Sequence, residues 1–217
     1  LPENPKSLDK TDTPDKKPTL KMTDERVFPF LVLAIAGGIA HATQVQSAAL
    51  YFQDMLHLNV QQTQQTVGIG LMAGAAAAMF AQMVLVQRLN PSPRSMIYYG
   101  LSLTAIGYVF LIFADSFALL VTSMVLTGMG LGLSRPGTNA AASLSVSQEE
   151  QGAIAGIMGG IGAAGHIMVP FISMNLYAIK PEYPFIFTLA LIVAVMVFAA
   201  KNQAVKKSGI TRTMDEQ

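Results

Sequence analysis

The stretch QGAIAGIMGGIGAAGHIMVPFISMNLYAI, residues 151–179, carries no Lys, Arg, Asp or Glu along its whole length. A helix rises 1.5 Å per residue, so about 20 apolar residues cross the roughly 30 Å of hydrocarbon in a bilayer. A soluble helix of this length would show a charged face, and this stretch has none. We therefore predict that it spans a membrane as a helix. Upstream, Ser147 and Glu150 have the spacing of a capping box, which predicts where that helix begins.

The same pattern recurs through the rest of the chain. With His counted as neutral, five further runs lack charge: residues 27–53, 58–87, 95–114, 116–134 and 183–200. No period-two alternation typical of membrane β-strands runs through residues 70–85 or 152–169, which leaves helices. We predict an all-α membrane protein with six transmembrane helices. Its predicted parts are a flexible cytoplasmic linker (1–26), six spans (27–53, 60–88, 95–114, 116–146, 148–177 and 183–202) and a cytoplasmic tail (203–217).

Composition excludes several classes of function. Only 12% of the 217 residues are charged and 52% are hydrophobic, whereas soluble domains carry about 25% charged residues. The net charge of +1 gives no basic excess for nucleic acid. Cysteine is absent, so thiolate metal sites are excluded, and we expect neither a metal nor a cofactor. No Walker A or G-x-S-x-G motif occurs, and we expect no enzymatic activity.

Basic residues sort to one side of the predicted spans. Only Lys180 falls on the other side, together with Asp54, Asp115 and Glu182. By the positive-inside rule, we predict that both termini lie in the cytoplasm. We also predict that the protein lies in the inner membrane of the cell. The residues on the basic side are Lys6, Lys10, Lys16, Lys17, Lys21, Arg26, Arg88, Arg94, Lys201, Lys206, Lys207 and Arg212.

Polar residues follow one face of the first span. His41 and Gln44 are one helical turn apart, and Tyr51 lies seven residues beyond Gln44 on the same stripe. Gln46 belongs to a second stripe at a different azimuth. Several polar groups aligned on one membrane helix favour a water-filled path over simple contacts between helices. We predict that these four residues bind substrate.

Only His41, His166 and Arg135 are ionisable at membrane depth, since every Asp and Glu lies in the linker, loops or tail. Arg135 is predicted near the cytoplasmic end of the fourth span, as a substrate contact. Snorkelling to the interface, an anion contact and an ion pair all remain open for it. His166 fits a contact between helices as well as a proton site. Pro136 predicts a kink suited to a gate.

Small residues dominate the fifth span. Gly152, Gly156 and Gly160 recur every four residues on one stripe, and Pro170 ends the glycine-rich run. In lipid, small residues let helix backbones approach each other closely, so these four positions are predicted to serve packing. The alternative is a smooth surface that slides or bends when a transporter changes state.

One pattern extends over two predicted helices and the loop between them: Gly132, Pro136, Ala140, Ser143, Gln151, Gly152 and Gly156. In this pattern the chain resembles the C-terminal half of major facilitator superfamily transporters, nearest to drug:proton antiporters such as tetracycline-efflux pumps. Gln87, Arg88 and Arg94 resemble the degenerate second copy of the family's signature, between its eighth and ninth helices. There the chain departs from the family, with Gln87 in place of Asp and with Asn90-Pro91 interrupting the glycine pattern.

The resemblance implies a twelve-helix carrier of which this chain supplies helices seven to twelve. The lipid bilayer and an N-terminal six-helix half would be its partners, and the first and fourth spans here would line a central cavity. The coupling carboxylates would sit in the N-terminal half. The implied function is multidrug-type efflux of small amphipathic organic compounds by proton antiport. A membrane-embedded assembly module without transport activity, or a carrier half for an anionic metabolite or metallophore, are the alternatives.

Overall fold

The computed structural model describes residues 20–208. Within that range six helices have the length and apolar composition to cross a membrane, and no strand is present. The predicted all-α fold with six membrane helices is therefore confirmed. Most of the predicted linker, residues 1–19, and the tail residues 209–217 lie outside the described range. The six helices are α1 (Phe28–Leu56), α2 (Val60–Phe80, continued to Leu89), α4 (Pro93–Ile112), α5 (Phe117–Leu144), α6 (Gln151–Ile179) and α7 (Tyr183–Lys201).

Local sequence signals account for where these helices begin and end. Helix α2 passes through a π-helical segment, Ala81–Val86, into α3 (Gln87–Leu89), and Asn90 then ends it in the left-handed region. The Ser147–Glu150 capping box is formed around a short 3-10 turn that leads into α6. Helix α8 (Gln203–Lys207) occupies the start of the predicted tail.

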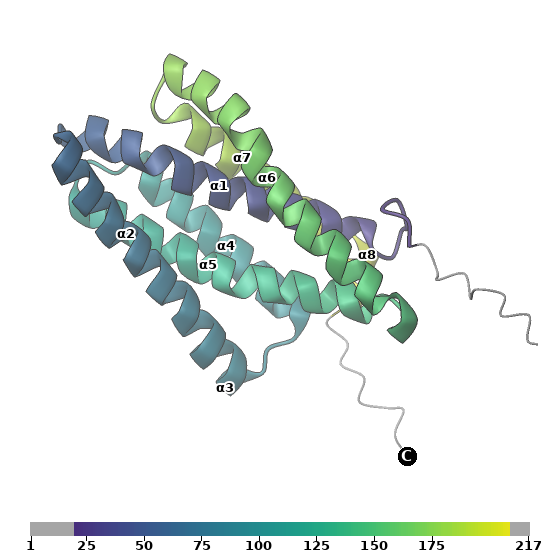
Figure 1. Ribbon diagram of the computed structural model, residues 1–217. Helices are drawn as coiled ribbons and strands as arrows, with labels where there is room; N and C mark the ends of the chain where they lie inside the picture. The colour runs from purple at the N-terminus through teal and green to yellow at the C-terminus, as the bar shows by residue number, and fades with distance from the viewer. Residues whose placement is uncertain (1–19, 209–217) are drawn as a thin grey trace, which may run out of the picture.

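The helices form two groups that meet where α1 contacts α5 and where α4 contacts α7. Helix α5 lies between α2 and α4, while α1 packs against α6 and α7, as Figure 1 shows. Close backbone approach holds the first group together. A Cβ atom added at Gly100 would lie 2.5 Å from the Ser134 nitrogen and 2.6 Å from the Gly130 oxygen. One added at Gly132 would lie 2.7 Å from the Ala78 oxygen, so glycine is required wherever α5 crosses α4 and α2.

A buried aromatic cluster lies where α1, α4 and α7 meet. The Tyr51 and Phe185 rings pack edge to face with centroids 4.7 Å apart, and Tyr108 lies beside Phe185. Both tyrosine hydroxyls donate to backbone carbonyls of a neighbouring helix, Tyr51 to Leu111 and Tyr108 to Ala40. The cluster therefore fixes the relative positions of these three helices and satisfies its own polar groups.

Several loops gather at one end of the bundle. A surface cavity there is lined by the start of α1, the loop between α3 and α4, the loop between α5 and α6, and α8. Arg26 and Lys207 line it, and the other basic residues of these segments lie close by in the chain. We call this the basic end. The fold thus brings together the segments that the charge pattern grouped, while their cytoplasmic location stays a prediction.

Candidate functional site: a cavity between α1, α5 and α6

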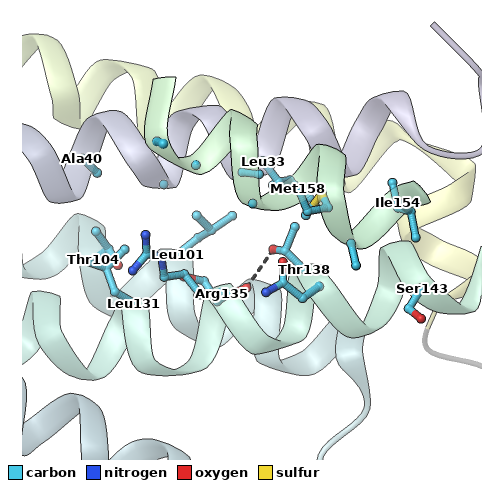
Figure 2. A pocket seen from close by; sticks show the side chains of 18 of the residues that line it. Leu33, Ala40, Leu101, Thr104, Leu131, Arg135, Thr138, Ser143, Ile154 and Met158 are labelled. Carbon is cyan, nitrogen blue, oxygen red and sulfur yellow. Dashed lines mark hydrogen bonds between the residues drawn. The ribbon is translucent and has the colours of Figure 1, made fainter. Parts of the chain in front are cut away.

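A cavity of about 790 Å³ lies between α1, α5 and α6, with residues of α4 and α7 at its back (Figure 2). Helices α1 and α5 meet beyond one end of the cavity, where the buried Gln44 side chain donates a hydrogen bond to the Thr127 hydroxyl. From there the cavity runs toward the basic end, along residues 33–40 of α1 and 131–143 of α5. Ser143 and Gln151 line both this cavity and the one at the basic end, so the two adjoin.

Most of the cavity wall is apolar. Aliphatic and methionine side chains from five helices form it: Leu33, Leu101, Leu131, Ile154, Met158 and Ile192. The hydroxyls on the wall are partly used within their own helices. Thr104 donates to the Gly100 carbonyl at 2.9 Å, and Thr138 donates to the Ser134 carbonyl at 2.7 Å. Their remaining capacity toward a ligand is therefore mainly as hydrogen-bond acceptors.

Arg135 extends from α5 into this cavity, as Figure 2 shows. Its depth in a membrane, near the cytoplasmic end of the fourth span, stays a prediction. Helix α5 continues to Leu144, nine residues further, which puts Arg135 about 14 Å from the helix end. Asn139 follows one turn later on the same wall. Its spacing of four residues from Arg135 was the signal that could have identified it.

Two histidines on neighbouring helices lie side by side. The rings of His41 on α1 and His166 on α6 are in edge-to-face contact, with centroids 5.6 Å apart. His166 lines the cavity together with Arg135. The fold thus puts His41 in contact with His166 and puts His166 and Arg135, which are distant in sequence, on the wall of one cavity.

The other residues predicted to bind substrate are placed elsewhere. Gln44 and Tyr51 are buried and use their side chains for the helix contacts described above, so the stripe they form does not line a water-filled path. Gln46 is exposed and donates to the His166 carbonyl at 3.2 Å. Of the five residues predicted as substrate contacts, Arg135 alone lines the cavity, and His41 reaches it through His166.

The predicted gating and packing residues also differ in their surroundings. Pro136 and Pro170 both lie inside helices, and α6 continues past Pro170 to Ile179. A Cβ atom added at Gly152, Gly156 or Gly160 would meet no atom within 4 Å, so this glycine stripe packs against nothing in residues 20–208. The close approach of α6 to α1 instead occurs at Gly165, where an added Cβ would lie 2.8 Å from the Gly38 carbonyl carbon.

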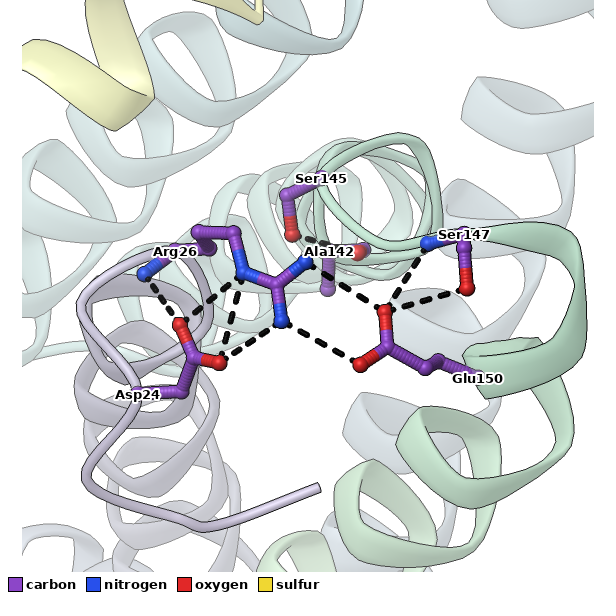
Figure 3. A network of polar contacts seen from close by, with 6 residues as sticks. All are labelled: Asp24, Arg26, Ala142, Ser145, Ser147 and Glu150. Carbon is purple, nitrogen blue, oxygen red and sulfur yellow. Dashed lines mark hydrogen bonds and ion pairs between the residues drawn. The ribbon is translucent and has the colours of Figure 1, made fainter. Parts of the chain in front are cut away.

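A polar network at the basic end joins the starts of α1 and α6 (Figure 3). The Arg26 guanidinium donates to Asp24 at 2.7 Å and to Glu150 at 3.2 Å. Glu150 also accepts the Ser147 backbone N–H at 3.0 Å. The hydrogen bonds from Arg26 lower the pKa of Asp24, and those same bonds raise the pKa of Arg26. The network therefore carries charge at neutral pH and couples the two helix ends.

Comparisons with known proteins agree with this fold. The family model described as Major Facilitator Superfamily matches residues 4–213. No curated protein matches the chain. Similar solved structures include a mutant of the peptide transporter POT with alafosfalin (TM-score 0.68, 15% identity) and with sulfate (0.65, 16%). A POT family transporter with a thioalcohol-conjugated peptide has a TM-score of 0.63 and 13% identity.

These alignments cover most of this chain but less than half of each solved structure. The shares of this chain are 88%, 84% and 82%, and those of the transporters are 42%, 39% and 38%. At such low identity the likeness concerns the fold alone, which is that of a six-helix portion of a larger bundle. Because the family model covers nearly the whole sequence and the helices are arranged as in these transporters, the chain belongs to the Major Facilitator Superfamily.

Proposed function

We propose that this chain forms the C-terminal half of a secondary active transporter that exports small amphipathic organic compounds in exchange for protons. An N-terminal six-helix half would complete the bundle and close the open side of the cavity. The observation that carries the proposal is the cavity between α1, α5 and α6. Membership of the superfamily, and a chain that spans about 40% of its solved relatives, support a transport role for one half of such a protein.

The size and lining of the cavity suit an amphipathic molecule. Small-molecule sites commonly enclose about 300–1,000 Å³ and combine mostly apolar walls with a few well-placed polar groups. This cavity has about 790 Å³, a wall of aliphatic side chains and a polar group at Arg135. Its continuity with the basic end supports substrate entry from the cytoplasm, if that end is cytoplasmic as the charge pattern predicts.

Fewer observations support alternating access and proton coupling. The bundle is tight between α4 and α5, while α1 and α5 diverge around the cavity, which supports movement of one group of helices against the other. No Asp or Glu lies in the middle of a described helix. Proton exchange would then depend on the N-terminal half, with His41 and His166 as the titratable groups available here.

The proposal is tested with the complete transporter, meaning this chain together with its N-terminal six helices. Everted membrane vesicles are loaded with a fluorescent amphipathic dye, and dye movement is recorded with a proton gradient and after an uncoupler. We expect movement that stops when the gradient is collapsed. Movement that continues unchanged would contradict proton coupling. The absence of movement for every amphipathic compound tested would favour the assembly-module function over transport.

A further inference from the structure

We propose that Arg135 and His166, with His41 in contact with His166, form a subsite for the anionic headgroup of an amphipathic organic acid. This inference rests on the proposed transport function and adds the charge class of its substrate. The apolar wall of the same cavity would hold the hydrocarbon or aromatic body of the acid. The ligand class is thus an organic carboxylate or a similar monoanion with one apolar end.

The first argument is an unbalanced charge. A guanidinium stays protonated in proteins, and a cation at membrane depth is costly unless it is solvated or paired. Among residues 20–208, Arg135 makes no ion pair and no hydrogen bond to another side chain. No carboxylate from that part of the chain lines the cavity. Arg135 is exposed on the cavity wall, so its charge is open to a counter-charge from outside these residues, and the cavity leaves room for a ligand to provide it.

The second argument is that the polar groups near Arg135 carry no negative charge and can donate hydrogen bonds. His166 faces the same cavity and contacts His41, and an imidazole can donate but carries no negative charge. Asn139, one turn from Arg135, adds an amide donor on the same wall. A cationic or electron-poor substrate headgroup would find repulsion here, whereas an anion would find up to three donors.

The third argument separates an organic acid from an inorganic anion. The wall beside Arg135 is built of Leu101 and Leu131, with Met158 across the cavity. An inorganic anion would leave this wall in contact with water. An apolar body attached to the anion removes apolar surface from water at about 25 cal/mol per Å². The lining therefore favours amphipathic acids.

The test compares three probes that share one aromatic body and differ in charge: 2-naphthoate, naphthalene-2-methanol and 2-naphthylmethylamine. Their binding to the complete transporter in lipid nanodiscs is measured by equilibrium dialysis. We expect the wild type to bind the carboxylate more tightly than the alcohol and the alcohol more tightly than the amine. Arg135→Gln should weaken carboxylate binding about tenfold or more, because a hydrogen bond to a charged group is lost, and should leave alcohol binding unchanged.

Two further variants make the result specific. Arg135→Lys keeps the charge and should restore most of the preference for the carboxylate. Lys201→Gln removes one positive charge at the end of α7, outside the cavity, and should leave all three affinities unchanged. His166→Gln should weaken carboxylate binding by a smaller factor than Arg135→Gln. Thermal unfolding of each variant checks that the fold is intact.

Several outcomes would overturn the inference: no binding of any probe, a preference for the amine, or an Arg135→Gln variant that keeps the carboxylate preference. The last result would mean that groups other than Arg135 cause the preference for the carboxylate. These outcomes are separable from failure of the proposed function. Uncoupler-sensitive export of neutral amphipathic compounds without anion preference would retain transport and refute the subsite. Anion-selective binding without any transport would retain the subsite and refute the proposed function.

Discussion

Helices α5 and α6 are both rich in glycine, yet the structure uses their glycines in opposite ways. On α5, backbone or side-chain atoms of α2 and α4 fill the space beside each glycine. On α6, a methyl group added at five of the glycines would face open space within the described part of the chain, and only one added at Gly165 would meet a neighbouring helix. The glycines in contact on α5 are Gly128, Gly130, Gly132 and Gly137, and the open ones on α6 are Gly152, Gly156, Gly159, Gly160 and Gly162.

The difference teaches what small-residue spacing means in a membrane helix. Such spacing indicates that a backbone can approach closely, but it does not identify the approaching partner. Helix α5 is enclosed by other helices, so its partners are present in this chain. Helix α6 lies at the margin, where Gly159 and Gly162 face the cavity. Its contacts with α1 include the 2.7 Å hydrogen bond between the Ser47 and Ser173 hydroxyls.

The strongest test of this comparison is Gly100→Ala. An added methyl would overlap the backbone of α5 at the Ser134 nitrogen and the Gly130 oxygen, which no side-chain rotation can relieve. We expect a loss of about 1–3 kcal/mol in the free energy of unfolding, typical of overpacking. Unfolding of the purified complete transporter in increasing denaturing detergent measures it. Gly68→Ala on α2, where an added methyl meets nothing within 4 Å, is the control and should remain near the wild-type value.

A smaller effect is expected where α6 is held by a hydrogen bond. Ser47→Ala removes the buried contact with Ser173, and hydrogen bonds between membrane helices contribute about 0.6 kcal/mol on average. The same unfolding assay should report a loss of that order. Ser47→Ala combined with Ser173→Ala should cost little more than the single change. A double variant whose loss is the sum of two independent losses would show that the two hydroxyls do not act as a pair.

The helix boundaries and the functional residues differ in how well the sequence predicts them. Charge-free runs predict the six spans because lipid excludes charge over a fixed thickness. A charge-free run alone ends at Ser134, whereas helix α5 runs on through Arg135 and Pro136 to Leu144. Helical spacing correctly put Gln44 and Tyr51 on one side of α1. Spacing alone does not predict that this side contacts Thr127 and Leu111, because the direction in which a helix face points is set by packing against distant segments.

Arg26→Gln should have a still smaller effect, because the ion pairs at the basic end are exposed and screened by water and salt. The way in which this effect on stability changes with pH follows from the pKa of Asp24. The pKa of Asp24 lies below its ordinary value of 3.8, so the contribution to stability is present above that value and is lost as pH falls through the lowered pKa. Thermal unfolding near pH 7 should show a slightly lower midpoint for the variant. A difference that grows on acidification would contradict this account.

The smallest effect is expected for Gly156→Ala on the open face of α6. An added methyl there meets no atom within 4 Å, and alanine is the better helix former. The change in the free energy of unfolding should stay within about 0.5 kcal/mol, as for surface substitutions. A loss as large as that of Gly100→Ala would show that the N-terminal half covers this stripe, and the contrast between α5 and α6 would then reflect only which partner is present.

The hydrogen bond between Gln44 and Thr127 also has a mechanical consequence. It lies on one side of the cavity, and Leu33 lines the same cavity eleven residues earlier on α1, about 16 Å away along the helix axis. If α1 turned about this contact, a rotation of about 10° would displace Leu33 by about 3 Å, comparable to the diameter of a water molecule. We therefore expect a small rotation of α1 to change the width of the cavity toward the basic end, with the start of α6 moving along because Arg26 pairs with Glu150.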